Sequence, residues 1–129
     1  MDMLDPISPN KIIVHSDRIE KILKGEFTPP VTLGLDLSNW CNHNCLWCLY
    51  DNYKKEHPYN MSKELIEKSI KDFKEIGGLS ICLSGGGEPL MNPEINFAIE
   101  KCEENNIEVS LNTNGGLLNI LSISSLNYL

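Results

Sequence analysis

The amino-acid sequence predicts an α/β fold made of parallel β/α units, and two observations support this prediction. Three short segments of strand character, at residues 31–37, 79–84 and 107–111, are separated by two segments whose apolar residues recur at helical spacing. No internal repeat or low-complexity stretch interrupts this order. Strand, helix, strand, helix, strand is the order of right-handed parallel β/α units. At 129 residues the chain is one domain's worth of sequence.

The first element is expected to be a short helix in an amino-terminal extension, residues 1–30. Within "SDRIEKILKGE", Ser16 or Asp17 can cap the helix start and Gly25 can end it. The Thr-Pro-Pro that follows enforces extended backbone. Residues 31–129 are then expected to form the core domain.

The three predicted strands each have one apolar side and one small or polar side. The apolar residues are Val31, Leu33, Leu35, Leu79, Ile81, Leu83, Ile107, Val109 and Leu111. The residues opposite are Thr32, Gly34, Asp36, Ser80, Cys82, Ser84, Glu108, Ser110 and Asn112. Because parallel sheets are usually covered on both sides, we expect helices on the apolar side and a ligand cavity along the polar side. An open sheet with one solvated side is the alternative.

Two amphipathic helices are expected between the strands. The first has Ser62 as its N-cap and Gly77-Gly78 as its stop, with Ile66, Ile70 and Phe73 on one face. The second has Asn92 as its N-cap and Pro93 at its first position. Its buried stripe is expected to be Ile95, Ala98, Ile99 and Cys102. The tail "GGLLNILSISSLNYL" has the pattern of a third helix.

Charge and composition exclude several classes of function. Eleven basic residues against 18 acidic ones give a net charge of −7, so no basic surface is available to bind nucleic acid. The sequence contains neither a secretory leader nor an apolar run long enough to span a membrane, which favours a cytoplasmic protein. In a reducing compartment, five cysteines, three of them crowded together, indicate metal ligands rather than disulfides.

The crowded cysteines, Cys41, Cys45 and Cys48, lie in "CNHNCLWC" directly after the first strand. Ligands bind at this end of the sheet in parallel β/α proteins. Structural zinc would need His43 as a fourth ligand, and its spacing to the cysteines is poor for a tetrahedral site. Unligated thiols are a second interpretation. An iron–sulfur cluster held by three thiolates, with one iron left free, is the third.

The spacing resembles that of the radical S-adenosylmethionine (radical SAM) superfamily, Cys-x3-Cys-x-aromatic-Cys, with Trp47 as the aromatic residue. The resemblance implies that Cys41, Cys45 and Cys48 hold a [4Fe–4S] cluster. It also implies that the free iron chelates the amino and carboxylate groups of S-adenosylmethionine, with Trp47 beside the adenine.

A second motif, "SGGGEPL", follows the second strand and resembles the family's Gly-Gly-Glu motif. The resemblance implies that Gly86, Gly87 and Glu88 bind the amino group of S-adenosylmethionine. Glycines permit close approach of a ligand to the backbone, and a carboxylate accepts hydrogen bonds from a cationic amine. A tight βα turn with a capping carboxylate is the alternative.

A third motif, "NTNG", ends the third strand and also resembles the superfamily. Asn112 and Asn114 are therefore candidate cofactor-binding residues, although Asn-Gly is also a turn signal.

The resemblance extends over residues 31–115 and implies the first half of a partial TIM barrel, with three of about six β/α units. We expect an amino-terminal fragment of an enzyme that reductively cleaves S-adenosylmethionine. The 5′-deoxyadenosyl radical abstracts hydrogen from a substrate that the sequence does not identify. The electron would come from an external donor such as flavodoxin or ferredoxin. A non-catalytic iron–sulfur or zinc-binding module is the alternative, and a half barrel completed by another chain is a third hypothesis.

Overall fold

The computed structural model describes residues 13–50 and 56–129. The first twelve residues of the predicted extension and residues 51–55 of the polar loop after the cysteines lie outside this part of the chain. The elements, in chain order, are α1 (Ser16–Leu23), β1 (Thr32–Asp36), α3 (Lys63–Glu75), β2 (Ser80–Ser84), η2 (Pro89–Met91), α4 (Ile95–Glu104), β3 (Glu108–Leu111), η3 (Leu118–Ile120) and α5 (Ile123–Tyr128).

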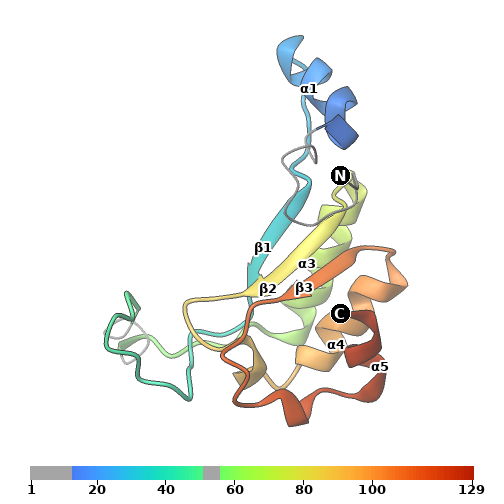
Figure 1. The fold of residues 1–129 in the computed structure, drawn as a ribbon. Helices are drawn as coiled ribbons and strands as arrows, with labels where there is room; N and C mark the ends of the chain where they lie inside the picture. Colours follow the sequence, from blue (N-terminus) through green and yellow to red (C-terminus); the bar gives the residue numbers. More distant parts are fainter. Residues whose placement is uncertain (1–12, 51–55) are drawn as a thin grey trace.

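The strands form one parallel sheet in the order β1-β2-β3, as the sequence predicts (Figure 1). Leu35 is paired with Leu83, and Leu83 is paired with Leu111, so equivalent positions of the three strands lie side by side. Each strand begins one residue later than predicted, and β1 also ends one residue earlier. The carboxyl ends of the three strands therefore meet at one edge of the sheet.

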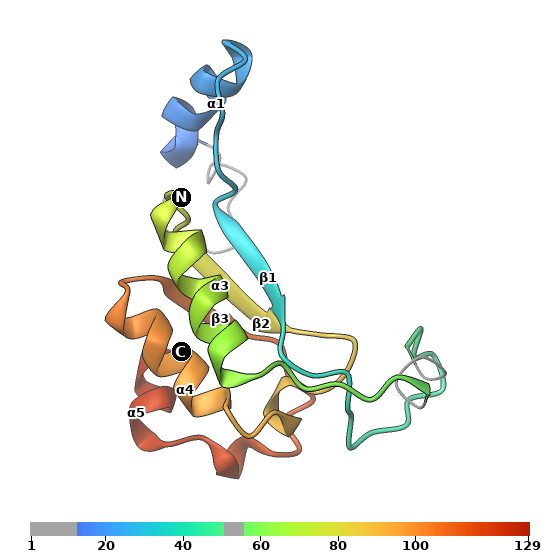
Figure 2. The same ribbon diagram turned by 180° about the vertical axis from the view of Figure 1, so that it is seen from behind.

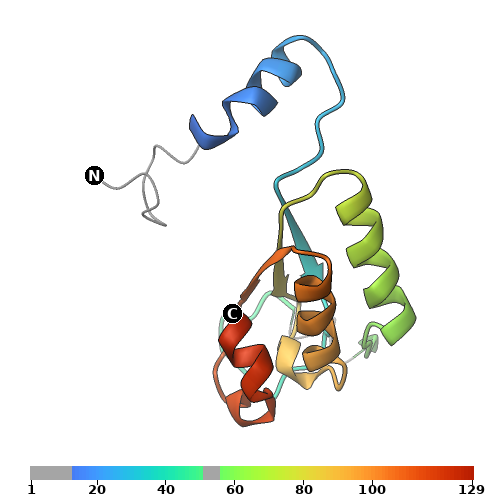
Figure 3. The same ribbon diagram turned by 90° about the vertical axis from the view of Figure 1, so that its right-hand side faces the viewer.

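Helices α3, α4 and α5 cover one side of the sheet, as the view from behind and the view from the side show (Figures 2 and 3). The apolar sides of the strands pack against them, and Ile81 and Leu83 of β2 are fully buried. In the described part of the chain the polar side of the sheet stays uncovered, and Thr32, Asp36 and Ser110 on it are exposed. The structure thus shows the predicted helical layer. On the polar side, Thr32 and Ser110 face solvent, and Asp36 lines a cavity at the carboxyl end of β1.

The predicted helix starts agree with the structure at α3 but not at α1 or in the tail. Ser62 caps α3 as predicted, because its hydroxyl accepts the N–H of Leu65. The prediction that Ser16 or Asp17 caps α1 is wrong: a 3₁₀ turn over residues 13–15 runs into the helix, and His15 occupies the cap position without a side-chain hydrogen bond. The tail forms two short elements, η3 and α5, rather than one helix, because Ser122 caps a new start.

Glycines end both of the first two helices in the same way. In α1 the N–H groups of Gly25 and Glu26 donate to the carbonyls of Ile22 and Lys21. In α3, Gly77 and Gly78 donate in the same pattern, and both Gly25 and Gly77 have positive φ. This is the Schellman arrangement, and it confirms the two predicted helix ends.

Helix α1 lies apart from the sheet, beyond the amino end of β1 (Figure 1). It has no buried residue. The guanidinium of Arg18 attaches it by donating to the carbonyl oxygens of Pro29 (2.6 Å) and Gly77 (2.7 Å). Across residues 13–50 and 56–129, no helix combines the length and apolar character needed to cross a membrane.

The predicted start of α4 is wrong by two residues, and the buried Asn92 that precedes the helix has long-range partners as well as a local one. Helix α4 begins at Ile95 rather than Pro93. The amide nitrogen of Asn92 donates to the carbonyls of Leu37 (2.8 Å) and Met61 (3.0 Å), while its oxygen accepts the N–H of Glu94. Asn92 therefore joins the segment after β1 to the start of α3.

Replacing Asn92 tests this connection. Asn92→Ala removes the hydrogen bonds to the buried Leu37 carbonyl and the part-buried Met61 carbonyl, so we expect the free energy of unfolding to fall by about 1–3 kcal/mol. The measurement is urea denaturation of the full chain, with the exposed Asn119→Ala as the matched control, which should change stability by less than about 0.5 kcal/mol. Equal stability of the two variants would contradict the role given to Asn92.

Candidate functional site

Three loops leave the carboxyl ends of the strands and meet. They are the cysteine loop (residues 40–50), the glycine loop (residues 85–88) and the third loop (residues 112–116). They contain all three motifs that the sequence singles out.

The base of the cysteine loop is closed by Asn39, which is buried. Its backbone N–H donates to the carbonyl of Tyr59 (3.1 Å), and its side-chain oxygen accepts the N–H of Tyr59 (2.6 Å). Its side-chain nitrogen also donates to the carbonyl of His57. No pattern in the sequence singles out Asn39, because its partners lie about twenty residues away. The segment from Asn39 to Tyr59 contains the cysteine loop, and its two ends are hydrogen-bonded to each other.

The three cysteines of this loop are reduced and accessible. Cys45 is exposed, and Cys41 and Cys48 are half-buried. Among the residues that the structure describes, no group of three or more His, Cys, Asp or Glu side chains is arranged to hold a metal ion. The thiols share one loop, but their sulfurs are not drawn together.

The other two cysteines differ in environment. Cys102 is buried in α4, and burial raises the pKa of its thiol to about 12. It therefore stays protonated and packs in the core as the sequence predicts. Cys82 is half-buried on the polar side of β2.

The glycine loop contacts the cysteine loop through its backbone. A Cβ on Gly87 would overlap the carbonyl oxygen of Trp40, and the N–H of Glu88 donates to that same oxygen at 2.6 Å. Gly86 lies against the ring of Tyr50: a Cβ added to Gly86 would be 3.1 Å from the nearest ring atom. These two glycines thus allow the backbone of the glycine loop to approach the cysteine loop closely.

Glu88 joins the glycine loop to the third loop. It is 2% exposed. One carboxylate oxygen accepts the hydroxyl of Thr113 (2.6 Å) and the N–H of Leu90 (3.0 Å), and the other accepts the N–H of Asn114 (2.8 Å). The bond to Leu90 caps η2, as in the alternative interpretation of the motif. Thr113 lies inside "NTNG", and the sequence pattern does not single it out as a site residue.

The contacts of Glu88 with the third loop and the cysteine loop form a junction of the three loops. The remaining predicted residues lie at different distances from it. The side chain of Asn114 reaches the cysteine loop, where its amide nitrogen donates to Oδ1 of Asn42 at 2.8 Å. Asn112 is exposed at the end of β3, and its backbone N–H donates to Leu83. Trp47 is 88% exposed. The structure brings Cys41, Glu88 and Asn114 together and leaves Trp47 in solvent.

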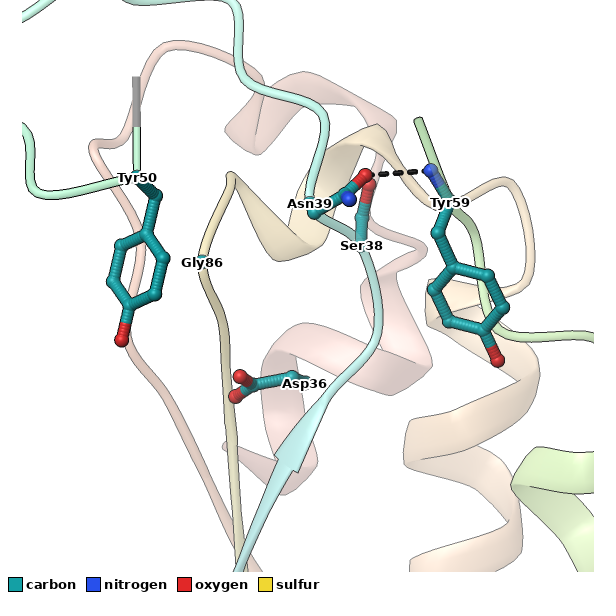
Figure 4. Close-up of a pocket in the computed structure, with 6 residues that line it drawn as sticks. All are labelled: Asp36, Ser38, Asn39, Tyr50, Tyr59 and Gly86. Carbon is teal, nitrogen blue, oxygen red and sulfur yellow. Dashed lines mark hydrogen bonds between the residues drawn. The ribbon is translucent and has the colours of Figure 1, made fainter. Parts of the chain in front are cut away.

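A cavity of about 210 Å³ opens between the cysteine loop and the glycine loop. Its lining residues are Asp36, Ser38, Asn39, Tyr50, Tyr59 and Gly86 (Figure 4). Figure 4 shows the Asp36 carboxylate pointing toward the segment that contains Gly86. Of these residues, only Gly86 belongs to the motifs noted in the sequence. The cavity combines a carboxylate with two aromatic rings at the carboxyl end of the sheet.

Comparison with protein families identifies the family of this chain. The family model of the Radical SAM superfamily matches residues 35–127. This chain belongs to the radical SAM superfamily. The superfamily is one of enzymes, and the resemblance drawn from the cysteine and glycine motifs is confirmed.

Individual relatives of this radical SAM chain are named as GTP 3′,8-cyclases. A probable GTP 3′,8-cyclase from Methanococcus maripaludis strain C7 is 36% identical over 85 residues, which cover 65% of this chain and 28% of the relative. One from Methanothermobacter thermautotrophicus is 36% identical over 93 residues, covering 70% and 29%. The GTP 3′,8-cyclase of Actinobacillus pleuropneumoniae is 29% identical over 105 residues, covering 79% and 31%. The chain therefore spans less than a third of the length of these relatives.

A solved structure confirms the fold. Streptococcus suis SuiB bound to S-adenosylmethionine matches with a TM-score of 0.62 and 21% sequence identity, over 100% of this chain and 28% of that chain. At this identity the match shows the fold alone. The predicted fold class, the first part of a radical SAM partial TIM barrel, is confirmed.

The contact of Gly87 with the cysteine loop can be tested with a pair of alanine variants. Gly87→Ala places a methyl group on the Trp40 carbonyl, so we expect the free energy of unfolding to fall by about 1–3 kcal/mol. Gly34→Ala is the control, because no heavy atom lies within 4 Å of a Cβ at that position. Urea denaturation measures both, and a Gly87→Ala protein as stable as Gly34→Ala would show that the two loops do not touch.

The carboxylate junction makes a second prediction. Glu88→Gln keeps the shape but turns an amide N–H₂ toward protein donors, so we expect about 1–3 kcal/mol lower stability. The exposed Glu103→Gln should be neutral. Thermal unfolding of both proteins is the measurement, and a neutral Glu88→Gln would contradict the hydrogen bonds assigned to Glu88.

Proposed function

We propose that this chain is the part of a radical SAM enzyme that binds a [4Fe–4S] cluster and S-adenosylmethionine. The observation that supports the proposal is the junction of the cysteine, glycine and third loops at Glu88. It joins, at one edge of the sheet, the motifs that the superfamily uses for cluster and cofactor.

Cys41, Cys45 and Cys48 are the proposed cluster ligands. Thiolates are the usual ligands of iron–sulfur clusters, and each of these thiols is at least partly accessible. The donor set fits such a cluster, and the loop closes around it on binding, as metal sites commonly form together with local folding. When bound and reduced, a cluster of this type supplies the electron that splits S-adenosylmethionine into methionine and a 5′-deoxyadenosyl radical.

Glu88 is the proposed acceptor for the cofactor's amino group, together with Gly86 and Gly87. A carboxylate has about four lone-pair positions, and protein donors occupy three of those on Glu88. The junction thus orients the carboxylate and leaves one position for an ammonium N–H. Gly86 lines the adjacent cavity.

Trp47, Asn112 and Asn114 are the other proposed cofactor-binding residues. Trp47 supplies an exposed aromatic face for the adenine. The two asparagines supply polar groups at the end of β3.

We also propose that residues 31–129 form the radical SAM core and residues 1–30 an extension, in a cytoplasmic protein served by an external electron donor such as flavodoxin or ferredoxin. The names of the relatives make GTP the first candidate substrate of the whole protein.

The test is anaerobic reconstitution of the full chain with iron and sulfide, followed by electron paramagnetic resonance after reduction. We expect about four irons per chain and a [4Fe–4S]⁺ signal that changes when S-adenosylmethionine is added. Tightly bound zinc and no cluster would refute the proposal and favour the zinc-binding module. A cluster whose electron paramagnetic resonance signal does not change when S-adenosylmethionine is added would favour a non-catalytic iron–sulfur module.

Cysteine variants identify the ligands. Cys41→Ala, Cys45→Ala and Cys48→Ala should each lose most of the bound iron, because each removes one of three thiolates. Cys82→Ala, at a half-buried cysteine outside the loop, should retain the wild-type iron content. Iron and sulfide assays measure both sets, and a loss of iron equal in Cys82→Ala and the loop variants would contradict the assignment.

A further inference from the structure

The side chain of Asn114 is held in one orientation. Its backbone N–H donates to Glu88, and its side-chain oxygen accepts the N–H of Gly116 at 2.9 Å. A backbone N–H can only donate, so the atom facing Gly116 is the amide oxygen. The amide nitrogen of Asn114 therefore faces the cysteine loop.

That nitrogen lies between two groups of the cysteine loop. It donates to Oδ1 of Asn42 at 2.8 Å and lies 3.9 Å from the sulfur of Cys41. An amide nitrogen has two hydrogens, so one can serve each partner. Sulfur is larger than oxygen, and its hydrogen bonds are correspondingly longer. Asn114 thus holds a donor against the first cysteine of the loop.

We propose that Asn114 is a positioning residue that donates a hydrogen bond to the Cys41 sulfur and raises the reduction potential of the cluster held there. This inference rests on the proposed function. Hydrogen bonds to ligating sulfurs are one of the determinants of cluster potential. A donor stabilises the more negative, reduced state, which makes reduction easier.

The first test is Asn114→Leu, which keeps the size of the side chain and removes the donor. We expect the equilibrium constant for reduction to fall roughly tenfold, which corresponds to 59 mV for a one-electron couple. The midpoint potential is measured on the reconstituted full chain by anaerobic redox titration with electron paramagnetic resonance detection. Asn119→Leu, at an exposed position of η3, is the matched control and should keep the wild-type midpoint.

The second variant, Asn42→Ala, distinguishes a hydrogen bond to sulfur from mere support of the loop. It removes the other acceptor and leaves in place the Asn114 hydrogen that faces Cys41, so we expect the midpoint to stay at the wild-type value. Loss of support alone would move both variants in the same direction. If Asn114→Leu fails to hold a cluster, Asn114→Ala replaces it, because it removes the same donor with a smaller side chain.

The outcomes also separate this inference from the proposed function. A wild-type chain that binds no cluster would refute both. A wild-type cluster that responds to S-adenosylmethionine, with an unchanged midpoint in Asn114→Leu or a lowered one in Asn42→Ala, would overturn the role of Asn114 and leave the proposed function standing.

Discussion

The carboxylate of Glu88 is the interaction on which the arrangement of the candidate site depends. A polar group removed from water is costly unless hydrogen bonds replace those it loses, so a carboxylate that is 2% exposed needs protein donors. Those donors come from η2 and the third loop, and the backbone N–H of Glu88 bonds to the cysteine loop. One residue thereby fixes the relative positions of the segments that follow all three strands.

This junction changes how the Gly-Gly-Glu motif is understood. A ligand-binding role and a turn with a capping carboxylate are alternatives when only the sequence is considered. In the structure the carboxylate caps η2 and Gly87 touches Trp40, yet one side of the same loop lines a cavity at Gly86. The two interpretations are compatible, because the protein contacts are what hold the loop at the edge of that cavity.

Features set by local chemistry could be predicted from the sequence. The strands, the Ser62 cap and the glycine-terminated helices depend on neighbouring residues, and they agree with the structure to within a residue. Asn92 is the opposite case. Its oxygen accepts the N–H of Glu94, as the oxygen of a cap does, but its amide nitrogen also donates to the carbonyls of Leu37, 55 residues away, and Met61, and its local sequence does not predict these contacts. Asn39 and Thr113 escaped prediction for the same reason, since their partners are distant in sequence.

The cysteine loop combines firm anchors with an accessible tip. Asn39 closes its base, and Gly87 and Asn114 contact its first residues, whereas Cys45 and Trp47 are exposed. Because the ends of the loop are already paired, binding of the proposed cluster would need to order only the tip. All of these anchors lie between β1 and the end of the third loop. The three β/α units therefore supply the anchors of the loop base and of the segment around Cys41, whereas Cys45 lies at the exposed tip.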